Sequence, residues 1–142
     1  MYQYTSIISV IMLKYLERTK KIYEKALKIY EAKKELTLSD KEDYSYLNFY
    51  MGNMQDSVDS FTKDEAFFYY EKIINNWCFD LKKTENQNLI SMYKALADRY
   101  FFRGNYNTSY KMYKYLYELG KKDEDIVSLL GDCLVEKNQL KE

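Results

Sequence analysis

Several residue types on which enzymes and metal proteins rely are scarce or missing from this chain of 142 residues. It has no histidine, and its two cysteines, Cys78 and Cys133, stand far apart without metal-ligand spacing. Histidine is the usual acid or base at neutral pH and, with cysteine, the usual zinc ligand. A phosphate-binding glycine loop and a nucleophile elbow are also missing from the sequence. We therefore expect a protein that is not an enzyme and that holds no cofactor or metal.

Proline is absent as well, and glycine occurs only four times. An all-β chain needs such residues at regularly spaced turns, so the composition favours an all-α fold. The formal net charge is zero, which argues against a nucleic-acid partner because phosphate binding needs a basic excess. The first apolar run is too short to cross a bilayer and lacks the pattern of a signal peptide. We expect a cytoplasmic protein with no membrane partner.

The two cysteines are expected to be buried, reduced thiols rather than a disulfide. Cys78 follows Trp77, and no base that could activate it is in view. The sequence therefore predicts a core residue there rather than a nucleophile.

Residues 6 to 35 carry an apolar stripe with the period of a helix face. Neither glycine nor proline interrupts it, so one long helix is predicted within residues 1–37, and a hairpin broken near Arg18 to Lys21 is the alternative. Basic residues outnumber acidic ones in 1–37, and the reverse holds in 38–72. This asymmetry is typical of solvated faces or of a self-complementary surface within one chain or between two. The stripe consists of Ile8, Ile11, Tyr15, Thr19, Ile22, Ala26 and Ile29.

Three candidate capping boxes mark further helix starts, at residues 39–42, 62–65 and 84–87. They predict helices from about 40 to 56, from 63 through Leu81, and from 85 to Arg103, and Gly52 is expected to weaken the first of these. Gly104 breaks the chain before a helix that ends at Gly120, where a left-handed cap is expected. A last helix runs from near Asp123 to residue 138. The sequence thus predicts about six helices and no strand.

One stretch carries a spaced pattern of large and small residues. Tyr93, Leu96, Ala97 and Tyr100 lie on one helix, Gly104 forms the turn, and Ser109 and Tyr113 lie on the next helix. After about 34 residues the pattern starts again with Val127, Leu130, Gly131 and Leu134. This pattern resembles the tetratricopeptide repeat. It departs from that family at Lys121, where proline is frequent, and at Ser109, where alanine is usual.

The resemblance implies antiparallel helical hairpins that stack as a short right-handed solenoid. We expect a single all-α domain over residues 1–142. Within it, residues 1–37 form the long helix, 38–83 form a degenerate repeat, and 84–142 form the tetratricopeptide-like repeat with a C-terminal capping helix. In the degenerate repeat, Asn53 and Met54 fall where the pattern has leucine and a small residue.

The resemblance also implies a groove, lined by the first helix of each hairpin, that binds a protein or peptide. Some relatives grip a C-terminal carboxylate in this groove, but Asp98 stands where they need asparagine, so that ligand is not expected. The groove candidates, carried over position by position, are Ser91, Lys94, Asp98, Phe101, Phe102, Asp125, Ser128, Asp132 and Val135.

Three functions are compatible with these features. The favoured one is a non-enzymatic adaptor that binds a protein or peptide through a tetratricopeptide-like surface. The second is a regulatory module or small chaperone, either part of a peptide-sensing regulator or a secretion chaperone. The third is a homo-oligomeric subunit, such as a homodimer, that assembles through the N-terminal helix. No helix-turn-helix is evident, which favours the adaptor.

Overall fold

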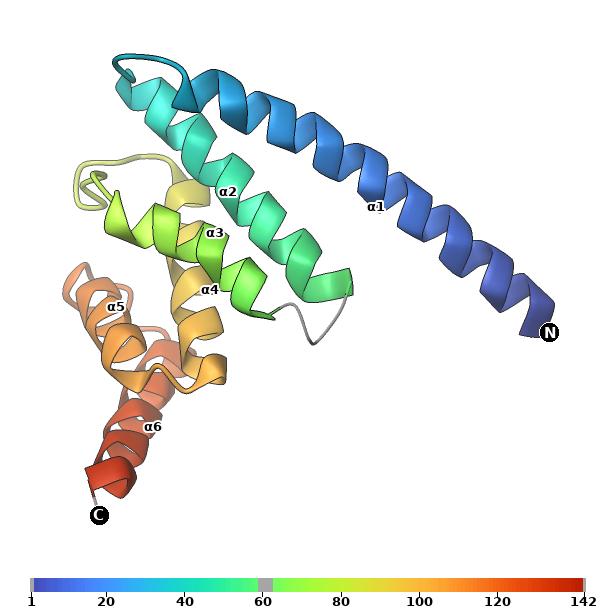
Figure 1. Cartoon of the computed structure of the whole chain (residues 1–142). Coiled ribbons are helices and arrows are strands. Elements are labelled where there is room, and N and C mark those ends of the chain that lie inside the picture. The colour runs from blue at the N-terminus through green and yellow to red at the C-terminus, as the bar shows by residue number, and fades with distance from the viewer. Residues whose placement is uncertain (1, 59–62, 142) are drawn as a thin grey trace. The chain divides into compact units, whose positions relative to one another are not determined.

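The computed structural model describes residues 2–58 and 63–141, which form six α-helices and, in these ranges, no strand (Figure 1). Helices that follow one another along the chain pack together: α1 on α2, α2 on α3, α4 on α5, and α5 on α6. The predicted all-α class with six helices is confirmed. The helices are α1 (Tyr2–Glu31), α2 (Leu38–Val58), α3 (Lys63–Asn75), α4 (Gln87–Arg103), α5 (Tyr106–Glu118) and α6 (Glu124–Lys141).

The chain divides into two compact units, Met1–Trp77 with helices α1 to α3 and Cys78–Glu142 with helices α4 to α6. The division falls a few residues before the predicted repeat boundary at 83. The expectation of a single domain stays a prediction.

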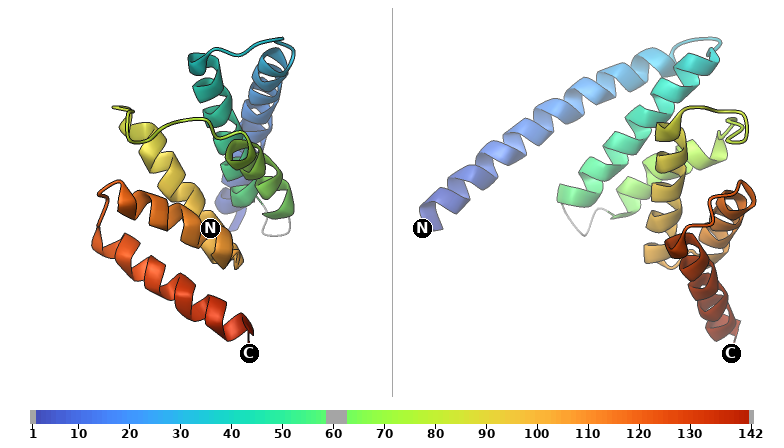
Figure 2. Two further views of the ribbon diagram at one scale, coloured as in Figure 1. Left: turned by 90° about the vertical axis from the view of Figure 1, so that its left-hand side faces the viewer. Right: turned by 180° about the vertical axis from the view of Figure 1, so that it is seen from behind.

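Helix α1 is one continuous helix of 30 residues, so the hairpin alternative for this segment is wrong. It packs on α2 through two ring pairs, Tyr23 with Tyr50 and Tyr30 with Tyr44, whose centroids lie 6.0 and 6.4 Å apart. The two helices diverge away from their connection, so the N-terminal part of α1 extends beyond α2 (Figures 1 and 2).

The first capping box lies two residues before the predicted one at Ser39. The amide of Asp40 donates to Thr37 Oγ1, and the amide of Thr37 donates to Asp40 Oδ2, both at 3.1 Å. Asp40 also accepts from Lys33 at 3.1 Å. The Thr37 amide and then Lys33 lower the pKa of the Asp40 carboxyl. Helix α2 therefore begins at Leu38, because Asp40 can serve both the cap and Lys33.

Of the other two predicted caps, one is replaced by a neighbouring residue and one lies outside the described residues. Helix α4 is capped by Asn86, whose Oδ1 accepts from the Asn88 amide at 3.0 Å, rather than by Thr84. Thr84 Oγ1 instead accepts from the Asn86 amide at 3.1 Å and so shapes the turn before the cap. The predicted cap at Thr62 lies outside the described residues.

Helix α3 ends at Asn75, earlier than the pattern predicted. Asn76 Nδ2 donates to the Lys72 carbonyl at 2.8 Å, a side-chain bond that satisfies one of the last carbonyls of the helix. Leu81 lies beyond the helix, although it is buried as expected of an apolar residue. Cys78 is exposed, so its predicted place in the core is wrong, because the chain has left the helix there.

Cys133 is buried in α6, and both cysteines are free. Its Sγ lies 3.3 Å from Ser109 Oγ on α5, and burial raises the pKa of the Cys133 thiol. This thiol therefore packs as a small core group between two helices.

The hairpin of α2 and α3 depends on a close approach at Gly52. A Cβ at this position would lie 2.3 Å from the Tyr70 ring, which is far inside contact distance. The Tyr70 hydroxyl then donates to Asn53 Oδ1 at 2.6 Å. Gly52 was expected only to weaken its helix, but it allows the buried Tyr70 to pack against the backbone of α2.

The hairpin of α4 and α5 repeats this arrangement. Ala97 and Tyr113 are fully buried, and the Tyr113 hydroxyl donates to Asp98 Oδ1 at 2.5 Å. In both hairpins a small residue on the first helix is followed by an acceptor side chain, to which a buried tyrosine of the second helix donates.

This equivalence corrects the register of the degenerate repeat. Met51 and Gly52, rather than Asn53 and Met54, occupy the places of leucine and the small residue. The sequence comparison missed this pair because the connection between α2 and α3 is longer than that between α4 and α5.

Candidate binding surfaces

Three of the predicted groove residues meet in one polar network within the C-terminal unit. Lys94 Nζ lies 3.1 Å from Asp98 Oδ2 on the same helix and 2.8 Å from Asp125 Oδ2 on α6. Asp98 also accepts the Tyr113 hydroxyl, so the network joins α4, α5 and α6.

The electrostatics of this network favour a structural role. Burial opposes the charge of Lys94, but the bonds to Asp125 and Asp98 outweigh it and raise the pKa of the ammonium. The bond between Lys94 and Asp125 also lowers the pKa of the Asp125 carboxyl. Burial, and then donation to Asp98, raise the pKa of the Tyr113 phenol. The Lys94 charge is thus engaged by two carboxylates within the unit.

The two predicted phenylalanines differ in their surroundings. Phe101 is half-buried, with its ring centroid 5.4 Å from that of Tyr106. Phe102 meets Phe101 edge to face and remains 79% exposed, the largest exposure among the large hydrophobic side chains that the structure describes. The remaining candidates Ser91, Ser128, Asp132 and Val135 are exposed on α4 and α6.

The apolar stripe predicted in the N-terminal helix does not face α2. Ile11, Tyr15, Ile22 and Ile29 are 60% to 67% exposed. Thr19 and Ala26, which share the predicted stripe, are half-buried, and the side chain of Ile8 lies outside the described residues. We call Ile11, Tyr15, Ile22 and Ile29 the exposed stripe of α1.

A second apolar face of α1 makes the contact with α2 instead. Leu27 is buried there, and Leu16, Tyr23 and Tyr30 are half-buried. At 3.6 residues per turn, this face lies roughly a third of a turn from the exposed stripe. This face was not predicted, although its residues also recur at helical spacing and form a second stripe in the sequence.

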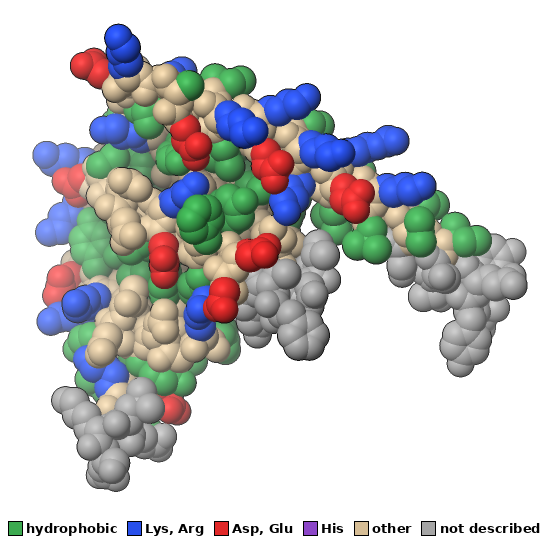
Figure 3. Space-filling view, viewed as in Figure 1, with side chains coloured by type: hydrophobic (Ala, Val, Ile, Leu, Met, Phe, Trp, Pro, Cys, Tyr) green, Lys and Arg blue, Asp and Glu red, His purple; other side chains and the backbone are tan. Residues whose placement is uncertain are grey.

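A row of basic side chains runs along the other side of the exposed stripe. None of its members makes an ion pair with another described residue, although Glu17, Glu24 and Glu31 lie on the same helix. Figure 3 shows Lys and Arg side chains along the outer edge of α1. We call this row the basic edge of α1; it consists of Lys14, Arg18, Lys21, Lys25 and Lys28.

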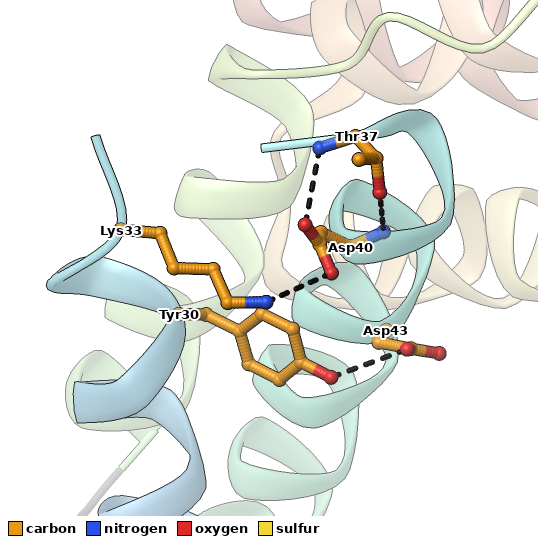
Figure 4. A network of polar contacts seen from close by, with 5 residues as sticks. All are labelled: Tyr30, Lys33, Thr37, Asp40 and Asp43. Atoms are coloured by element: carbon orange, nitrogen blue, oxygen red, sulfur yellow. Dashed lines mark hydrogen bonds and ion pairs between the residues drawn. The ribbon is translucent and has the colours of Figure 1, made fainter. Parts of the chain in front are cut away.

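A pocket of about 430 Å³ lies in the same unit, between the end of α1, the start of α2 and the end of α3. Beside it, Lys33 pairs with Asp40, and the Tyr30 hydroxyl donates to Asp43 Oδ2 at 3.2 Å (Figure 4). Burial, and then this bond, raise the pKa of the Tyr30 phenol. The sequence did not predict this pocket, because its walls come from three separate helices and the segment between α1 and α2.

Among the described residues, no group of three or more Cys, Asp or Glu side chains is placed to hold a metal ion. None of the helices in the described ranges is both long enough and apolar enough to span a bilayer. Comparisons of the chain with protein-family models, curated proteins and solved structures found no match. The resemblance to the tetratricopeptide repeat therefore rests on the residue pattern alone.

Proposed function

We propose that this protein is a non-enzymatic protein-binding module and that the exposed stripe of α1 receives the partner. The observation that carries the proposal is the double amphipathicity of α1: one apolar face packs on α2, and a second is left open to solvent. Apolar rows with a rim of charge are typical of interaction surfaces in soluble proteins.

The spacing of the stripe fits a helix as its occupant. Tyr15, Ile22 and Ile29 are seven residues apart, the spacing of one core position in a coiled coil. Between Tyr15 and Ile29, Arg18 and Lys25 interrupt the row, so the apolar surface there is about one side chain wide. Nearer the N-terminus, four further large apolar side chains are exposed: Ile7, Val10, Met12 and Leu13. A narrow row suits a groove in a second helix, whereas a helix lying in a membrane surface needs a broad apolar face.

The basic edge defines the charge of that partner. Two copies of α1 packed stripe to stripe would bring Arg18 and Lys25 against like charges. An amphipathic helix with acidic residues beside its apolar row would instead pair with Lys21, Lys25 and Lys28. We infer a partner protein that presents such a helix, and charge complementarity would set its orientation and partner choice.

The C-terminal unit supports a finer proposal, a tetratricopeptide-like hairpin with α6 as its cap. The pattern residues are buried at both helices of the hairpin, and both Gly104 and Gly120 have a left-handed φ of 92°. Phe102 is the groove candidate best placed to meet a peptide, because its ring is open to solvent. The engaged Lys94 is a positioning residue in this proposal.

A designed peptide tests the α1 surface directly. The probe is a labelled amphipathic helix with leucine at heptad positions and glutamate on both flanks, and fluorescence anisotropy measures its binding. We expect Ile22→Ser/Ile29→Ser to weaken binding at least tenfold (about 1.4 kcal/mol), because two exposed anchors are lost without disturbing the core. Val127→Ser/Val135→Ser on α6 is the matched control and leaves binding unchanged.

Three further measurements separate the other occupants. A peptide with lysine in place of glutamate should not bind. Equal binding of the two peptides would show that the basic edge does not select an acidic partner. Vesicles containing anionic lipid should bind more weakly than the acidic peptide; tighter vesicle binding would assign the stripe to a membrane. Light scattering should give the 17.2 kDa of one chain. A dimer that Ile22→Ser/Ile29→Ser dissociates would replace the proposed partner by a second copy.

A further inference from the structure

The pocket of the N-terminal unit has the size of a small-molecule site. Its volume of about 430 Å³ lies in the range of ligand pockets, roughly 300–1,000 Å³. Two tyrosines, Tyr30 and Tyr44, and two aliphatic residues, Leu36 and Ile73, are among the residues that line it. A planar ligand body would therefore find aromatic and aliphatic contacts on several sides.

Positive charge predominates in this wall. Four lysines line the pocket, with Glu31 as the acidic lining residue. Glu31 Oε1 already accepts the Tyr44 hydroxyl at 3.0 Å and lies 3.5 Å from Lys72 Nζ. Lys33 pairs with Asp40 behind the wall. Lys34 and Lys41 make no ion pair with any described residue, so two ammonium groups stay available to an anion.

Asn48 adds a buried acceptor to the wall. This residue is 1% exposed, its Nδ2 donates to the Tyr44 carbonyl at 2.9 Å, and its Oδ1 has no partner within the described part of the chain. A buried acceptor without a donor is costly, and such groups frequently mark a bound water or ligand.

A comparison with the C-terminal unit shows why there is space here. When Met51 and Gly52 are matched to Leu96 and Ala97, Asn48 takes the place of Tyr93. Tyr93 fills its position with a buried ring that meets Tyr115 at 5.6 Å. The smaller amide in α2 leaves out that ring volume and puts a polar acceptor in its place.

We propose that this pocket binds a small planar organic anion that also carries a hydrogen-bond donor. The anion lies at Lys34 and Lys41 on the rim, and the planar body lies between the tyrosine rings and Ile73. The donor reaches Asn48 Oδ1, a buried atom that a small shift of the lining side chains must uncover. The site is independent of the exposed stripe of α1, since Ile22 and Ile29 do not line it.

Three related probes separate the three requirements, and NMR titration of the isotopically labelled full chain measures their binding. The probe 4-hydroxybenzoate has a ring, an anion and a donor; benzoate lacks the donor, and phenol lacks the anion. We expect the amides of Lys34, Lys41 and Asn48 to shift with 4-hydroxybenzoate, and benzoate and phenol to bind at least about fivefold more weakly. Inorganic phosphate should bind more weakly than benzoate; equal binding would overturn the planar body.

Variants assign each requirement to its residue. Lys34→Ala/Lys41→Ala should weaken 4-hydroxybenzoate at least about fivefold, whereas Lys82→Ala/Lys83→Ala, exposed lysines of the other unit, should not. Asn48→Leu keeps the branching and the number of heavy atoms of the side chain and removes the orphan acceptor, so we expect a folded chain in which the advantage of 4-hydroxybenzoate over benzoate disappears. The proposal is overturned if no amide around the pocket shifts, or if either variant binds all probes like the unaltered chain.

Discussion

Helices α1 and α4 carry apolar stripes of the same period, yet the structure buries only the stripe of α4. Leu89 and Leu96 of α4 are almost fully covered, whereas Ile22 and Ile29 of α1 lie in solvent. Helix α4 has one apolar face, and it packs on the hairpin partner α5. Helix α1 has two, and α2 covers the one that contains Leu27. Helical period shows that a face is apolar, but it does not show which of two such faces will be covered.

The largest test of this contrast truncates one residue of each stripe. Leu96→Ala removes a fully buried side chain and leaves a cavity, so we expect the free energy of unfolding to fall by about 2–5 kcal/mol. Ile22→Ala removes an exposed side chain and should change it by less than about 0.5 kcal/mol. Urea unfolding followed by circular dichroism measures both. Similar losses in the two variants would show that the stripe of α1 is covered in solution.

A smaller effect is expected from two helical glycines, one in each unit. Gly52→Ala places a methyl group against the buried Tyr70 ring and should cost about 1–3 kcal/mol of stability. Gly131→Ala meets nothing within 4 Å and should stabilise the chain by up to about 1 kcal/mol, because alanine favours the helix. Thermal unfolding of both variants provides the measurement. A neutral Gly52→Ala would contradict the close approach of α2 and α3.

The smallest effect concerns the ion pair that ties α6 to α4. Asp125→Asn breaks the bond to Lys94 at a half-open site and should cost about 0.2–1 kcal/mol at neutral pH. Because the pKa of the Asp125 carboxyl is lowered in the folded state, its contribution is present above about pH 4 and fades as the pH falls through that lowered pKa. The urea midpoints of the variant and the unaltered chain should therefore differ at neutral pH and converge at acidic pH. A constant difference at all pH values would exclude the ion pair as its cause.

The predictions that succeeded rest on interactions within a few residues. The start of α6 near Glu124 follows from acidic side chains at the positive end of a helix, and the left-handed turns at Gly104 and Gly120 follow from the freedom of glycine. Tyr93, Leu96 and Tyr100 are buried because one apolar row has one possible neighbour in its hairpin.

The predictions that failed needed information from elsewhere in the chain. Thr37 and Ser39 are both good caps by sequence. In the structure Thr37 caps the helix, and its partner Asp40 also accepts a hydrogen bond from Lys33 of the preceding segment. Gly52 looked like a weak point because its partner Tyr70 lies on another helix. The pocket that Asn48 lines could not be predicted from the sequence, because residues of α1, α2 and α3 come together to form its wall.

By itself, the sequence determined the helical class, the six helices, their main turns and the apolar rows on their surfaces. These features follow from backbone preferences, capping and periodicity, which act over one or two turns of helix. Only the tertiary structure decided that α2 covers the Leu27 face of α1 and leaves the Ile22 face open. It also decided that lysines from three segments gather around Asn48. Both outcomes depend on how whole helices pack together, which no short segment of sequence specifies. Between α2 and α3, Gly52 against Tyr70 allows the close approach.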